Sequence, residues 1–216
     1  MSPGLFGTLA AAAVAVGALH TLAPDHWVPF AALARAQRWS AARTARVTVA
    51  CGFGHVTVSA LLGLLGLFLG HEMMQAFGRR MEAAAGILLV GFGLAYGVWG
   101  LRRAAGKRLH GHAHAHYDHV HDPSGATAWT LFLLFSADPC VAVIPLLFAA
   151  APLGAAPTTA IVLAYEIATI ATMVALVLPA SAGARIIRAA WLDRYGDAAA
   201  GGVIAVVGVA VTWLGW

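Results

Sequence analysis

Charged side chains are scarce in this sequence. Asp, Glu, Lys and Arg make up only 10% of the 216 residues, and 61% of the residues are hydrophobic. Soluble domains carry about 25% charged residues, so this composition excludes an ordinary soluble domain, whose surface needs more polar side chains. We therefore expect a single transmembrane domain over residues 1–216, with most of its apolar surface in contact with the lipid bilayer.

Cysteine and nucleotide-binding motifs are also scarce or missing. The two cysteines, Cys51 and Cys140, both lie inside apolar runs, which excludes a disulfide framework. No G-x4-G-K-[ST] stretch occurs, because Gly106 and Lys107 are followed by arginine, so no built-in ATP motor is expected. Residues 1–4 carry no Lys or Arg, which favours a retained first span over a cleaved signal peptide.

Six apolar runs are long enough to cross a bilayer, which takes about 20 residues in a helix. Helices are predicted because a helix satisfies its own backbone hydrogen bonds in lipid, and because these runs are too long for barrel strands. The sequence therefore predicts an all-α integral membrane protein with six transmembrane helices. These cover approximately residues 5–22, 47–69, 83–101, 128–150, 158–180 and 198–216.

Positive charge alternates between the connecting loops. The first, third and fifth loops are basic, the second is balanced in charge, and the fourth is uncharged. The positive-inside rule then predicts a bacterial cytoplasmic membrane protein with these three loops in the cytoplasm and both termini outside. Nucleic acid is not expected as a partner, because the arginines lie in separate blocks instead of one stripe. The basic residues are Arg35, Arg38, Arg43 and Arg46 in loop one, Arg102, Arg103, Lys107 and Arg108 in loop three, and Arg185, Arg188 and Arg194 in loop five.

The two sets of three spans show weak internal similarity. The first span ends in PDHWVP, residues 24–29, and the fourth contains DPCVAVIP, residues 138–145. His55 and Glu166 lie at similar depths in the second and fifth spans. These pairs predict a 3+3 inverted repeat in which helices one and four are broken at proline, an arrangement that places binding sites near the bilayer midplane.

Ionisable side chains occur in or at the ends of four spans. Each costs at least about 2.5–3.5 kcal/mol at mid-bilayer, so we expect them to converge on one another, on water or on a cation. Imidazole and carboxylate together suit Ni²⁺, Co²⁺ and Zn²⁺, while a purely structural polar network is the alternative. In a continuous helix His20 and His26 would point about 120° apart, so a break at Pro24 is needed to bring them together. The set is His20, Asp25, His26, His55, Asp138 and Glu166.

Three motifs resemble those of the nickel/cobalt transporter family. His20-x4-Asp25-His26 resembles its H-x4-D-H signature, and FGHVTVS, residues 53–59, is similar to its second motif, usually written LGHSTVV. SADPCVAVIPLL, residues 136–147, looks like the proline–cysteine segment of the six-span efflux branch. The sequence departs from the family where valine replaces the usual serine after the motif histidine, and the further motifs of eight-span importers are not found.

The resemblance implies a transporter of divalent metal ions with nickel or cobalt as its cargo, and zinc as a further option. No permanently bound cofactor and no enzymatic activity are expected. By the resemblance the metal-site residues are His20, Asp25, His26 and His55. The candidates for a second-half site or for proton coupling are Asp138, Cys140, Glu166 and Thr169.

A histidine-rich tract lies in the third loop, approximately residues 102–127, which joins a first half over about 1–101 to a second half over 128–216. Alternating histidines in a polar tract commonly bind borderline metals. We interpret this cytoplasmic loop as a metal-capture or sensing segment, with a solvated loop of no further role as the alternative. Its histidines are His110, His112, His114, His116, His119 and His121.

Transport direction has to be argued from energetics. Moving two positive charges outward against 100 mV costs about 4.6 kcal/mol, so export would need coupling, for example to proton entry. The histidine loop and the six-span resemblance favour such secondary efflux over uptake, with an uptake permease as the alternative. A homo-oligomer is compatible with the sequence. The alternative from another class is a membrane thiol–disulfide electron carrier of the cytochrome-biogenesis type, which would need a cysteine in each of the first and fourth spans.

Overall fold

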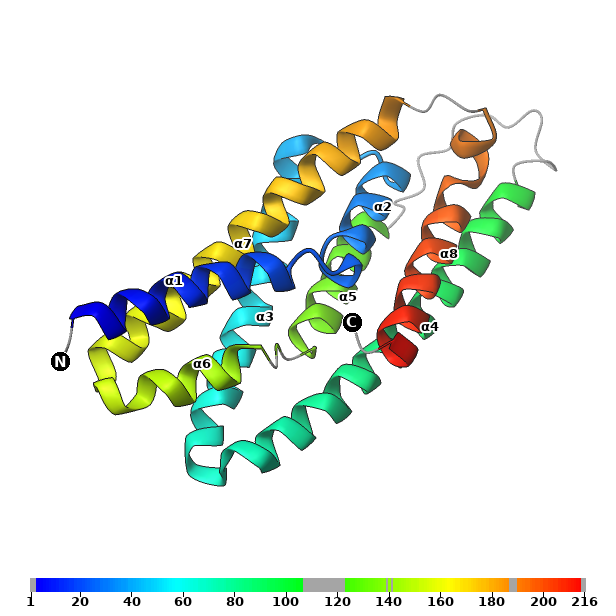
Figure 1. Cartoon of the computed structure of the whole chain (residues 1–216). Coiled ribbons are helices and arrows are strands. Elements are labelled where there is room, and N and C mark those ends of the chain that lie inside the picture. The colour runs from blue at the N-terminus through cyan, green and yellow to red at the C-terminus, as the bar shows by residue number, and fades with distance from the viewer. Residues whose placement is uncertain (1–2, 107–122, 139, 141, 187–189, 215–216) are drawn as a thin grey trace.

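The computed structural model describes residues 3–106, 123–138, 140, 142–186 and 190–214, and within them it contains helices and no strands. The predicted all-α class is confirmed for this part of the chain (Figure 1). In chain order the helices are α1 (Pro3–His20), the 3-10 turn η1 (Pro24–His26), α2 (Val28–Ala36), α3 (Ala41–Leu69), α4 (His71–Gly106), α5 (Pro123–Ser136), α6 (Val143–Ala150), the 3-10 turn η2 (Ala151–Leu153), α7 (Ala155–Ile186) and α8 (Ala190–Leu214).

Several helices are long and apolar enough to cross a membrane. Four pass this test by length and hydropathy, and a fifth is added if α1 and the η1–α2 segment count as one span bent by 79°. The apolar helices α5 and α6 are shorter and together cover the predicted fourth span. The membrane-protein class is therefore supported, whereas six spans and an inverted repeat stay predictions. The four straight candidates are Ala41–Leu69, Arg79–Gly106, Ala155–Gly183 and Arg194–Trp213.

The helices extend beyond the predicted apolar runs. α3 begins at Ala41 instead of residue 47, because the Ser40 side chain accepts a hydrogen bond from the Arg43 backbone N–H at 3.2 Å and caps the helix. α4 begins at His71 instead of residue 83, so the predicted second loop is helical and the only turn left before it is at Gly70. Gly70 has φ +93°, a conformation that glycine adopts without steric cost.

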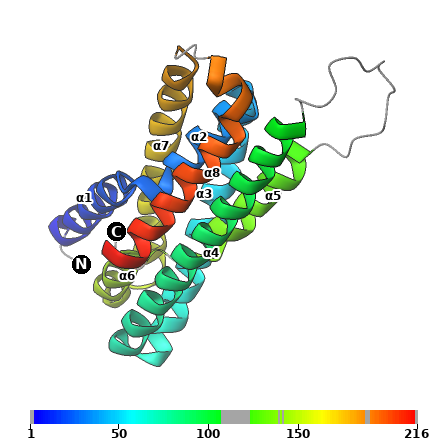
Figure 2. The ribbon, with the colours of Figure 1, turned by 90° about the vertical axis from the view of Figure 1, so that its right-hand side faces the viewer.

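The helices pack as two closely joined groups. Figures 1 and 2 show α4 and α8 side by side along most of their length, and α1 lying along α7. α3 contacts both α5 and α7, while α2 reaches α7 and α8. The α1–α7 approach is close, because a Cβ added at Gly17 would lie 2.8 Å from the Tyr165 carbonyl oxygen.

Two buried apolar clusters form the interior. The first includes Phe30, Leu33 and Phe135, and the second includes Cys140 and Tyr165. The outer surface is also apolar, with large side chains strongly exposed on several helices, as expected for a lipid-facing surface. Examples are Phe53, Leu61, Phe68, Ile167, Val206 and Trp213.

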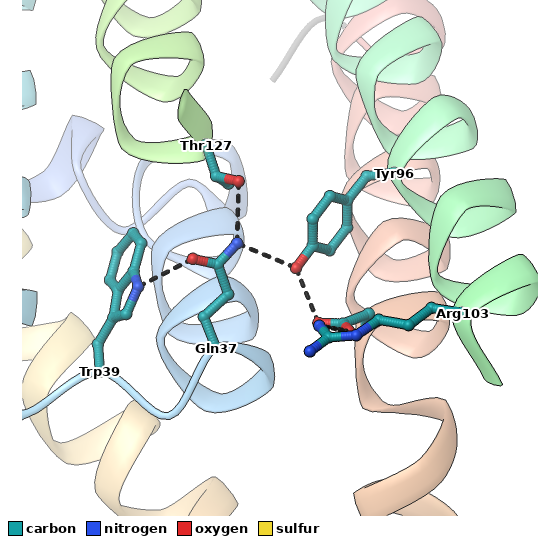
Figure 3. Close-up of polar contacts among 6 residues, drawn as sticks. Gln37, Trp39, Tyr96, Arg103 and Thr127 are labelled. Carbon is teal, nitrogen blue, oxygen red and sulfur yellow. Dashed lines mark hydrogen bonds and ion pairs between the residues drawn. The ribbon is translucent and has the colours of Figure 1, made fainter. Parts of the chain in front are cut away.

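A polar network joins the helix ends that flank the three basic loops (Figure 3). The Gln37 amide donates to the Tyr96 hydroxyl at 3.2 Å and to the Thr127 hydroxyl at 2.9 Å, and its oxygen accepts from the Trp39 indole at 3.0 Å. Tyr96 then donates to Asp197 at 2.9 Å. Arg103 contacts the other oxygen of that carboxylate at 3.1 Å. The network thereby ties the end of α2 to α4, α5 and α8.

Tyr96 is the central residue of this network, because its hydroxyl both accepts from Gln37 and donates to Asp197. We expect Tyr96→Phe to lower the free energy of unfolding of the detergent-solubilised protein by about 1–2 kcal/mol. The reason is that Gln37 and Asp197 each lose a partly buried hydrogen bond to the tyrosine hydroxyl. Tyr195→Phe, which keeps a ring against Arg194, is the matched control and should change stability by less than about 0.5 kcal/mol. Equal melting curves for the two variants would contradict this prediction.

Candidate metal site

The break after α1 brings two motif histidines together. α1 ends at His20, and tight backbone turns follow, in which Ala23 N–H donates to the His20 carbonyl at 3.1 Å and His26 N–H to the Ala23 carbonyl at 3.2 Å. Pro24 opens η1, where it removes a backbone donor that a continuous helix would require. The rings of His20 and His26 consequently lie 4.3 Å apart between centroids. The predicted break is present and has the predicted effect.

His55 reaches the same place from the middle of α3. Its ring centroid lies 5.3 Å from that of His26, and its side chain is 1% exposed. His55 Nδ1 lies 3.2 Å from the carbonyl oxygen of Phe135. A carbonyl can only accept, so Nδ1 carries the proton and Nε2 keeps its lone pair. That Nε2 has no hydrogen-bond partner among the residues that the structure describes.

A third chain segment contributes Cys140, which lies between α5 and α6. Each of three residues, His20, His55 and Cys140, offers one ligand atom, and these three atoms all lie within 4.8 Å of one another. A tetrahedral metal centre with bonds of about 2.0–2.3 Å holds its ligand atoms about 3.3–3.8 Å apart. A small inward movement of side chains would therefore complete a three-ligand site. The sequence placed Cys140 only in a second-half group, whereas the structure places it with the first-half histidines.

Asp25 lies beside His26 and not in the three-ligand group. Its carboxylate oxygen Oδ1 is 3.0 Å from His26 Nδ1, and both side chains are buried. A carboxylate on one ring nitrogen fixes the tautomer of a histidine and orients the other nitrogen for a ligand, as in carboxylate–histidine–metal triads. The 3.0 Å contact therefore suits Asp25 to orient His26, as one of the metal-site residues that the resemblance implied.

Two aspartates from separate helix breaks, one between α1 and α2 and the other between α5 and α6, lie at one small cavity. Asp25 and Asp138 both line a space of about 10 Å³, which is closed on its other sides by residues of α4, α5 and α8. Such a volume is about that of one water molecule in an enclosed site. Two of the six ionisable residues singled out in the sequence therefore lie at the same small space.

The other second-half candidates, Glu166 and Thr169, both lie on α7, and Glu166 is not a member of the three-ligand group. Glu166 is half-buried in α7, and Thr169 is fully buried on the same helix, where its hydroxyl would lie 3.0 Å from a Cβ at Gly17. Thr169 thus marks the close α1–α7 contact. The six loop histidines, residues 110–121, lie outside the described residues.

Two further residues, Ser59 and Tyr165, support the site, and the sequence did not single them out for that role. The Ser59 hydroxyl donates to the His55 carbonyl at 2.7 Å and accepts from the Cys140 N–H at 2.7 Å. The Tyr165 hydroxyl contacts Cys140 Sγ. Spacing offered one signal, because Ser59 follows His55 by four residues and so shares its helix face. Nothing in the sequence indicated Tyr165.

Phe135 forms an apolar wall beside the histidines. Its ring centroid lies 4.7 Å from that of His55, 5.6 Å from that of His26 and 5.1 Å from that of Phe30. Its backbone carbonyl holds His55 as well. An apolar wall lowers the local dielectric, which strengthens the interaction between a cation and its ligands.

The set of donor atoms is typical of sites for borderline transition metals, which take imidazole nitrogen and thiolate sulfur. Comparisons of this chain with protein-family models, with curated proteins and with solved structures found no match. The function is therefore inferred from the chemistry of the site itself.

Proposed function

We propose that this protein is a secondary transporter of divalent transition-metal ions, with Ni²⁺ or Co²⁺ as the cargo and export as the direction. The observation that carries the proposal is the meeting of His20, His26 and His55 at a helix break inside a strongly apolar bundle. The Nε2 atoms of His20 and His55 are buried and have no hydrogen-bond partner among the described residues, which is costly in an apolar interior. A cation that passes through the site would satisfy them.

The order of helices supports a 3+3 inverted repeat. A broken helix is followed by two long helices in each half, as α1–η1–α2, α3 and α4, and then as α5–α6, α7 and α8. The packing pairs also correspond, because α1 contacts α7 while α5 contacts α3. With α5–α6 as the fourth span, the chain would cross the bacterial cytoplasmic membrane six times. The charge pattern then favours a cytoplasmic histidine loop and external termini.

Export needs a driving force, since the membrane potential opposes outward movement of two positive charges by about 4.6 kcal/mol at 100 mV. Proton entry could supply it, and Glu166 is a candidate proton carrier because it is a half-buried carboxyl group on α7. The histidine loop would capture metal on the cytoplasmic side. The redox alternative gains no support, because Cys51 and Cys140 are free and belong to different buried clusters.

Flux measurements in proteoliposomes test the proposal. The wild-type chain is expected to move Ni²⁺ or Co²⁺ across the membrane faster when a proton gradient of the correct sign is imposed. His20→Ala should reduce this flux by about tenfold, because it removes one nitrogen from the three-ligand group. His71→Ala, at the start of α4 and outside both the three-ligand group and the histidine loop, is the control and should retain most of the flux.

Absence of flux for both metals, or equal flux in wild type and His20→Ala, would reject the transporter proposal. The sign of the proton gradient that accelerates transport separates efflux from uptake.

A further inference from the structure

Cys140 differs from an ordinary buried cysteine in what its sulfur faces. A free cysteine in a protein interior usually behaves as a small apolar residue, and Cys51 fits that description, since it belongs to the first apolar cluster with Phe30 and Leu33. Cys140 is 2% exposed, and its Sγ lies within 4.8 Å of ligand nitrogens from His20 and His55. The Nε2 atoms of both histidines are buried and have no hydrogen-bond partner among the described residues.

The backbone N–H of Cys140 is hydrogen-bonded to α3, the helix that carries His55. Ser59 accepts the Cys140 N–H and donates to the His55 carbonyl, so one hydroxyl connects two members of the three-ligand group. On the other side the Tyr165 hydroxyl contacts Sγ. A hydroxyl donated to sulfur stabilises a thiolate, and outer partners of this kind orient metal ligands.

Charge balance also favours a sulfur ligand here. A dication in an apolar bundle is stable only if negative charge lies close to it. The Asp25 carboxylate, next to His26, supplies one negative charge. The Cys140 thiol supplies a second when it releases its proton and forms the metal–sulfur bond. The loaded site is then neutral, with imidazoles as the remaining ligands.

We propose that Cys140 is a direct ligand of the transported ion, and that its sulfur restricts the cargo to cations that accept thiolate and imidazole together. This class includes Ni²⁺, Co²⁺ and Zn²⁺ and excludes the oxygen-preferring ions Mg²⁺, Ca²⁺ and Mn²⁺. The inference rests on the proposed metal transport and specifies which metals that site takes.

X-ray absorption spectroscopy tests the ligand directly. The full-length protein in detergent, loaded with one equivalent of Zn²⁺ or Ni²⁺, should show one sulfur neighbour at about 2.3 Å beside nitrogen ligands. The chain has two cysteines, so Cys51→Ser is a matched control for Cys140→Ser. We expect the sulfur neighbour to be lost only in Cys140→Ser, with metal affinity at least about tenfold lower, and Mn²⁺ to fail to displace the bound metal.

Two outcomes overturn the inference while leaving metal transport in place. One is a wild-type protein that binds and transports metal with nitrogen and oxygen neighbours only. The other is a Cys140→Ser variant with the same metal–ligand spectrum as Cys51→Ser. The wild-type spectrum decides the question even if Cys140→Ser does not fold. A wild-type protein that neither binds nor transports these metals rejects the transporter proposal, and the cysteine assignment is rejected with it.

Discussion

Replacing His55 with glutamine is expected to reduce the proposed metal transport by about 100-fold or more. His55 is the most enclosed of the three ligands, at 1% exposure, and its Nδ1 proton is held by the Phe135 carbonyl so that Nε2 faces the site. Loss of an outer partner of a metal ligand alone costs about 10- to 100-fold, so loss of the ligand itself should cost at least as much. Metal flux in proteoliposomes and metal binding by calorimetry both measure this effect.

Glutamine is chosen because it is close to histidine in size and keeps a polar side chain with donor and acceptor atoms at the buried position. The fold should therefore be preserved, which the melting temperature of the variant checks. His71→Gln makes the same chemical change at the start of α4, outside the proposed site and the histidine loop, and should leave transport within a few-fold of wild type. Wild-type flux in His55→Gln with an unchanged melting temperature would remove His55 from the metal site.

Gly201→Ala is expected to destabilise the protein strongly. A Cβ at Gly201 would lie 2.3 Å from the Gly97 backbone nitrogen and 2.6 Å from the Gly93 carbonyl oxygen. These are backbone atoms, so α8 would have to move away from α4. Overpacking of this kind costs about 1–3 kcal/mol, and more where backbone has to shift. Thermal unfolding in detergent, and the yield of folded protein from membranes, measure the loss.

Gly202→Ala is the matched control, because a Cβ at the adjacent position meets nothing within 4 Å. Alanine favours a helix over glycine by up to about 1 kcal/mol, so this variant should be neutral or slightly more stable. A melting temperature of Gly201→Ala equal to or above that of Gly202→Ala would contradict the close contact between α4 and α8.

The helical class and the break near Pro24 were predictable from the sequence because both depend on local properties. Long apolar runs require helices in lipid, and proline removes a backbone donor wherever it occurs. The expected meeting of His20 and His26 followed from helix geometry alone and is found. Helix ends were less predictable, because hydropathy predicts only the part of a helix that lies in lipid. The helices α3 and α4 continue through polar residues that also favour a helix.

The long-range contacts were not predictable from spacing. Cys140 joins His20 and His55 only because the interruption between α5 and α6 packs against α1 and α3. The same holds for the Tyr165 contact with Cys140 and for the polar network at Gln37, whose members lie far apart in the chain. Motif resemblance placed Asp25 in the metal site, but its contact with the neighbouring His26 depends on the turn at η1 and could not be read from the motif.

The glycine contacts between α4 and α8 have a mechanical consequence. Backbone touches backbone at Gly93, Gly97, Gly201 and Gly208, where an added Cβ would lie 2.3–3.6 Å from atoms of the opposite helix. The helices α4 and α8 cannot slide past each other without clashes between side chains and the partner's backbone. We therefore expect the two helices to move as one rigid unit. Opening of the candidate metal site then has to occur elsewhere. The break between α1 and α2, which holds Asp25 and His26, interrupts the helical hydrogen bonds and is one place where the described chain can bend.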